Sequence, residues 1–117
     1  MSAAPRESIQ EAAAAAALGA SGVAELQPAL ADRLALAASR ATTPGTTPHR
    51  AAGAIRCEHT PQGGWHVEVR CVLHADRRLV DVARQVREDV RTAVTACLTR
   101  RGATVPVTVL VTVTRTV

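Results

Sequence analysis

Residues 76–113 read DRRLVDVARQVREDVRTAVTACLTRRGATVPVTVLVTV and contain two regular patterns, a helical one followed by an alternating one. In the first, apolar residues return every three or four positions, which predicts one buried stripe on a long helix. We expect Asp76 to cap this helix and Gly102 to follow its end, just behind a pair of arginines that favour the negative end of the helix dipole. The stripe consists of Leu79, Val82, Ala83, Val86, Val90, Ala93, Val94, Cys97 and Leu98.

The alternating pattern places valine at every second position from Val105 to Val113. Such a period of two predicts a β-strand whose valine face is buried. Thr108, Leu110 and Thr112 then lie on its other face. Pro106 has no N–H for a ladder, so we expect this strand to start at a sheet edge or to lie along one.

Two shorter alternating stretches precede the helix, one around Ile55 and Cys57 and one from Trp65 to Leu73. The residues between them, PQGG at 61–64, are turn formers and predict a hairpin. Charge selects the register of that hairpin. Pairing Arg56 with Glu68 and Glu58 with His66 avoids like charges, whereas a two-residue slip would oppose Glu58 and Glu68.

The N-terminal half predicts helix and loop. We expect residues 1–7 to be a flexible tail and a helix to begin at Ser8, with Glu11 completing a capping box. An alanine run continues this helix to Gly19–Gly22. A short second helix is expected over 29–39, and a loop rich in threonine and proline over 41–51.

Together these elements predict one α+β domain over residues 8–117, a two-layer sandwich in α-β-β-α-β order. A three-stranded mixed sheet would be covered on one face by the long C-terminal helix and the N-terminal helix, and its other face would be wet. We expect the first hairpin strand to be central. The alternative order, with the last strand beside Val67–Leu73, stays open.

Composition narrows the function. The 117 residues are 47% hydrophobic, but Trp65 is the one aromatic residue, so modules that stack bases on aromatic rings are excluded. All 14 basic residues are arginine, and the net charge of +4 is a weak argument for an anionic partner. Three cysteines do not make a disulfide framework and favour a cytoplasmic setting. No apolar run is long enough to span a bilayer.

The chain resembles the alkaline shock protein family of bacterial envelope-stress proteins. The resemblance rests on GVAEL at 22–26, the valine-rich strand 65–73, and LVDVARQV from residue 79 followed by Gly102 and the strand 105–113. It implies a non-enzymatic cytoplasmic protein in cell-envelope homeostasis, which self-associates or docks on a small membrane-anchored partner at the inner face of the membrane.

Residues capable of catalysis or metal binding do not fall into a working pattern. Cys57 and Cys71 alternate onto the apolar face, where thiols are poor nucleophiles, and Glu58 and Glu68 alternate onto an open face. On a strand Cys71 and His74 point apart, which opposes a zinc site. We therefore expect no catalytic residue, no cofactor and no metal.

Two features favour binding instead. The polar face of the long helix carries Arg84, Arg87 and Arg91, which could bind an acidic partner or anionic headgroups. The alternative is an ordinary solvated helix face with an Arg84–Glu88 ion pair. The unpaired edge of a short sheet could accept another strand. A KH-like nucleic-acid module is the alternative, because GASG at 19–22 spells a GxxG turn, although one set far from the last helix.

Overall fold

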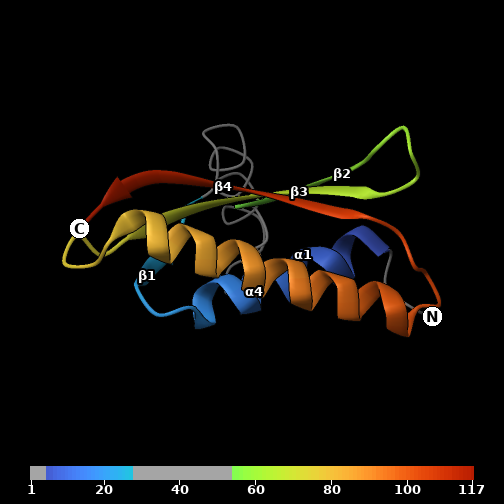
Figure 1. Cartoon of the computed structure of the whole chain (residues 1–117), viewed down its shortest axis with the longest axis horizontal. Coiled ribbons are helices and arrows are strands. Elements are labelled where there is room, and N and C mark those ends of the chain that lie inside the picture. The colour runs from blue at the N-terminus through green and yellow to red at the C-terminus, as the bar shows by residue number, and fades with distance from the viewer. Residues whose placement is uncertain (1–4, 28–53) are drawn as a thin grey trace, which may run out of the picture.

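The computed structural model describes residues 5–27 and 54–117, in which two helices pack side by side against one face of a mixed sheet (Figure 1). The α+β class and the covering of one face by both helices are as predicted. The sheet has a fourth strand that the sequence reading missed. The elements are α1 (Pro5–Gly19), β1 (Val23–Leu26), β2 (Ile55–His59), β3 (Trp65–Leu73), α4 (Leu79–Arg100) and β4 (Val107–Thr116).

Helix α4 forms as its apolar stripe predicts, but it begins later than expected. Arg78, not Asp76, precedes its first residue, and no side chain caps it. The end is as predicted: Gly102 has φ +79°, and its N–H donates to the carbonyl of Thr99 at 2.9 Å. Ala103 donates likewise to Leu98, so the last carbonyls of the helix are satisfied.

The hairpin register is the one that charge selected. Arg56 lies opposite Glu68 and Glu58 opposite His66 in the antiparallel pair of β2 and β3. The odd-numbered residues of β2 and β3 consequently share the face that the helices cover.

The expected strand order is wrong, and the alternative is the observed one. β3 is central, with β2 and β1 on one side and β4, parallel to it, on the other. The lengths and burial of β2 and β3 explain why β4 pairs with β3. β3 has nine residues, all buried or half-buried, whereas β2 has five and three of those are exposed. Pairing the ten-residue β4 with β3 therefore satisfies more backbone groups than pairing it with β2 would.

The N-terminal helix also departs from its predicted start. It begins at Pro5, so residues 5–7 belong to the helix and Ser8 lies inside it rather than capping it. Proline suits a first helical turn because the N–H that it lacks would have no partner there. The predicted helix at 29–39 and the loop at 41–51 lie outside the described residues.

The core lies between the helices and the sheet. α4 contributes Val86, Val90 and Val94, which are fully buried, and α1 contributes Ile9 and alanines of its inner face. They meet the fully buried face of β3, made of Val67, Val69, Cys71 and Leu73. Val107, Val109 and Val111 of β4 are partly buried against the same cluster, whereas Val113, which the pattern placed on the same buried face, is 37% exposed.

The other face of the sheet is less exposed to solvent than expected. Val72 points to it and is nevertheless fully buried. It lies opposite both Glu25 of β1 and Arg115 of β4, and these two form an ion pair at 3.1 Å that crosses β3. A bulge at Thr114 supports the crossing, because the Thr114 hydroxyl donates to the Gln27 side chain at 2.9 Å.

Gly22 yields a test of this packing. Its φ of +97° disfavours any side chain, and a Cβ there would lie 2.8 Å from a methyl group of Val82. We expect Gly22→Ala to lower the free energy of unfolding by about 2–4 kcal/mol, from backbone strain plus the clash. Gly63→Ala is the control, since Gly63 has φ +83° but open space around it, and we expect a loss of about 1 kcal/mol.

Urea denaturation followed by circular dichroism measures both variants. Equal losses would show that the contact between residue 22 and α4 contributes nothing.

Candidate functional site

The three predicted arginines lie together on the outer side of α4. Arg84, Arg87 and Arg91 are all exposed, while Val82, Val86 and Val90 of the stripe are buried. Spacings of three and four residues place their side chains on one helical face. We call this surface the arginine face.

Few intramolecular contacts compete for the arginine face. The expected Arg84–Glu88 pair does not form; in residues 5–27 and 54–117 the side-chain ion pairs are Arg78–Asp81 and Arg115–Glu25. The neighbouring acid Asp89 instead accepts a hydrogen bond from Gln85 at 2.8 Å. The guanidinium groups of the arginine face consequently keep their donors directed to solvent, where a carboxylate or a phosphate could accept them.

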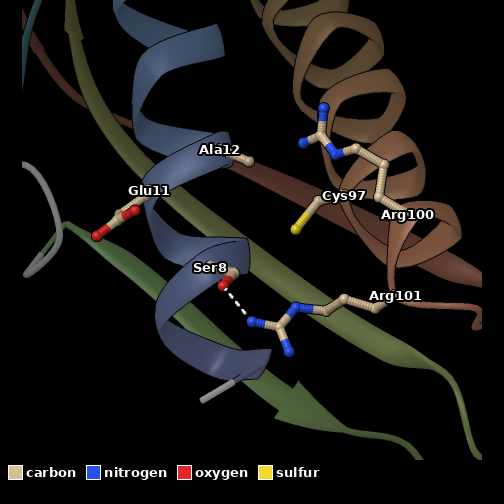
Figure 2. A pocket seen from close by; sticks show the side chains of 6 residues that line it. All are labelled: Ser8, Glu11, Ala12, Cys97, Arg100 and Arg101. Carbon is tan, nitrogen blue, oxygen red and sulfur yellow. Dashed lines mark hydrogen bonds between the residues drawn. The ribbon is translucent and has the colours of Figure 1, made fainter. Parts of the chain in front are cut away.

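A second feature, which the sequence reading missed, is a cleft of about 440 Å³ between the start of α1 and the end of α4 (Figure 2). Arg101 reaches across it and donates to the hydroxyl of Ser8 at 2.6 Å. Figure 2 shows Cys97 pointing between the two helices and Glu11 pointing away from both. The cleft is lined by Ser8, Glu11, Ala12, Cys97, Arg100 and Arg101.

The cleft provides binding groups rather than a nucleophile with a base. A serine or cysteine nucleophile needs a base within hydrogen-bond reach, and the partner of Ser8 here is a guanidinium, which does not lose its proton. No histidine is among the described lining residues. Because the two residues that define the cleft are 93 positions apart, only the antiparallel packing of α1 on α4 brings them together.

All three cysteines are free and buried. Desolvation raises the pKa of Cys57 to about 11, and the positive charge of Arg6 offsets only part of that effect. Burial also raises the pKa of Cys71. Both thiols are therefore held in the protonated, unreactive form at neutral pH, which fits their place in the apolar core.

Two histidines of the hairpin strands contact other side chains. The ring of His59 stacks on Trp65 with centroids 3.8 Å apart, and His66 shares a hydrogen bond of 3.0 Å with Thr108. Within the described residues no three His, Cys, Asp or Glu side chains come close enough to hold a metal ion.

The GxxG turn is explained by packing. Gly22 abuts Val82 of α4, and its carbonyl accepts the N–H of His74 at 2.9 Å. The structure also brings Arg77 beside this turn, with its Cδ 3.5 Å from where a Gly22 Cβ would be, a cation that the local sequence lacks. The turn thus joins α1 to β1 against the start of α4.

Neither helix in the described ranges, 5–27 and 54–117, is long and apolar enough to cross a membrane. Comparisons of the chain with protein-family models, with curated proteins and with solved structures gave no match.

The raised thiol pKa values predict resistance to alkylation. At about pH 8, a thiol with a pKa of about 11 has roughly a hundredfold less thiolate than one at the ordinary 9.0. We expect iodoacetamide to label Cys57 of the folded protein about a hundredfold more slowly than free cysteine, and to label Cys71 more slowly than free cysteine as well. Peptide mass spectrometry over a time course measures the rates, with the protein unfolded in guanidinium as the control. Labelling of folded Cys57 at the rate of free cysteine would contradict its burial.

Proposed function

We propose that this chain is a non-catalytic interaction protein that acts by contact through the arginine face. The proposal joins the exposed arginines of α4 to the resemblance to the alkaline shock proteins. It assigns the chain to cell-envelope homeostasis in the cytoplasm. There it would dock on an acidic segment of a small membrane-anchored partner at the inner face of the membrane, and self-association is its second mode of contact.

The observation that carries the proposal is the contrast between the two sides of α4. Val86, Val90 and Val94 are fully buried, so the helix cannot rotate or slide without opening the core. Arg84, Arg87 and Arg91 are thereby held at fixed spacing on a rigid element. Guanidinium groups match carboxylates in a planar, two-pronged geometry, and preorganisation lowers the entropic cost of binding.

The chemistry of the cleft and of the cysteines favours contact over turnover. The cleft between the helices holds Ser8 against a cation, and the thiols on the sheet are buried in the core. A surface that works by contact needs no water-excluding pocket, only exposed groups with a matching partner.

Reversal of one charge on the arginine face tests this function. We expect immobilised Arg87→Glu to capture an acidic protein from native membranes at least about tenfold less than the parent does, because attraction becomes repulsion. Arg77→Glu is the matched control: it makes the same charge change at an exposed arginine that precedes the helix. Quantitative mass spectrometry of membrane and cytosolic fractions gives the readout. Identical capture by the parent and Arg87→Glu would refute docking through this face.

The salt dependence of RNA binding distinguishes the nucleic-acid alternative from the proposed function. Arg77 beside the Gly19–Gly22 turn is the observation that favours it. Binding through phosphates weakens steeply as salt rises, whereas the proposed function requires no binding to RNA. We expect a labelled single-stranded RNA to show no anisotropy change with the protein at low salt. Tight binding with a steep salt slope, lost in Arg77→Glu, would establish the KH-like alternative instead.

A further inference from the structure

The outer edge of β4 is open. β4 pairs with β3 along one side, and no strand within the described ranges pairs with the other. Proteins commonly protect such edges with charged residues, prolines, bulges or short length. From residue 107 to residue 113 this edge has none of them: seven residues without charge or proline, with the bulge only at Thr114.

The backbone groups that face outward can be assigned from one hydrogen bond. Trp65 donates to the carbonyl of Pro106 at 3.0 Å, so the even-numbered residues of β4 bond to β3. The odd-numbered residues, four valines, therefore direct their N–H and C=O groups away from the sheet. They are Val107, Val109, Val111 and Val113.

Leu110 is out of place on this strand. It lies on the face that carries Thr108 and Thr112, and 48% of it is exposed. It stands at the midpoint of the open stretch, three residues from Val107 and three from Val113. A large apolar side chain at the centre of an unpaired edge suits burial against another strand.

The open stretch reads VTVLVTV, which is the same in both directions. In an antiparallel pair centred on Leu110, every residue would meet its own kind: Val107 with Val113, Thr108 with Thr112, Val109 with Val111, and Leu110 with Leu110. The boundaries agree with that centre, since Pro106 ends the stretch on one side and the bulge at Thr114 ends it on the other.

We propose that β4 pairs with β4 of a second copy of this chain, antiparallel and centred on Leu110, to form one continuous sheet across a two-fold axis. The four valines of each copy would supply about eight backbone hydrogen bonds. The valine faces would align, so the helical layers of both copies lie on the same side of the joined sheet. The proposal rests on the proposed function, for which it specifies the mode of self-association.

A second copy fits this edge better than a foreign strand. An isologous interface requires a surface that complements itself, and an edge that reads the same in both directions does so. No charge lies within the stretch, so the two copies oppose no like charges. Because β4 is already ordered by β3, pairing adds little conformational cost to the translational and rotational entropy that any association loses.

Arginine at the proposed axis tests the pairing. We expect the parent chain to have twice the chain mass by light scattering after size exclusion, and Leu110→Arg to be a monomer, because the two-fold axis sets the new charge against its own copy. Leu18→Arg is the matched control, the same substitution at a leucine that is 50% exposed on α1, and we expect it to remain a dimer. Circular dichroism checks that both variants fold. A monomeric parent across a concentration series, or a dimeric Leu110→Arg, would overturn the proposal.

A cysteine scan tests the register. Directly opposed residues at a non-hydrogen-bonded position have Cα atoms about 4.5 Å apart, within disulfide range. We expect Leu110→Cys to cross-link to its own copy under mild oxidation and Thr108→Cys to do so only when Thr112→Cys is added, since residues 108 and 112 face each other. Cross-linking by Thr108→Cys alone, with none by Leu110→Cys, would reject the register.

The same variants separate this inference from the docking function. Leu110→Arg leaves the arginine face intact, so it should lose the dimer and keep the Arg87-dependent capture. If Arg87→Glu instead captures as the parent does while Leu110→Arg is monomeric, docking fails and the pairing stands. A monomeric parent with Arg87-dependent capture gives the opposite result.

Discussion

The packing of the α4 valines on the central strand β3 is the constraint on which the other features depend. Val86, Val90 and Val94 are fully buried against a strand whose inward residues are also fully buried. With so few aromatic residues, the core is built from branched aliphatic side chains that fill space only when helix and sheet stay in one register. That fit fixes which side of α4 faces solvent, and so places the arginine face on the surface.

The sequence predicted structural features that depend on neighbouring residues, such as the hairpin register. It did not predict those that depend on which of two strands pairs better with a third, such as the strand order. The register of β2 on β3 followed from the charges of Arg56, Glu58 and Glu68, because a slip has a definite electrostatic cost. The strand order depended on whether β2 or β3 offered β4 the better ladder, which alternation alone does not rank. β1 was missed because four residues with one exposed position carry too little periodic signal.

The same distinction holds for the candidate sites. The exposure of Arg84, Arg87 and Arg91 was predictable, since it is the complement of the buried stripe. The cleft was not, because Ser8 and Arg101 meet only through the packing of two helices that no pattern in either one encodes. The helix starts at Pro5 and Leu79 were also misjudged, because a good capping residue marks where a helix could begin without requiring that it begin there.

The two edges of this sheet are treated differently, and the difference gives the palindromic stretch its meaning. On one side β2 is short and carries the exposed charges of Arg56 and Glu58, and β1 occupies the rest of that edge. These are devices that discourage further pairing. On the other side β4 is ten residues long and uncharged before Arg115, and that arginine is engaged by Glu25 across β3. Within residues 5–27 and 54–117 one edge thus carries protecting features, while the longer edge carries none from residue 107 to residue 113 and has a self-complementary sequence, so the proposed pairing would use a single surface. Pairing at one surface about a two-fold axis closes at two copies instead of extending into a fibre.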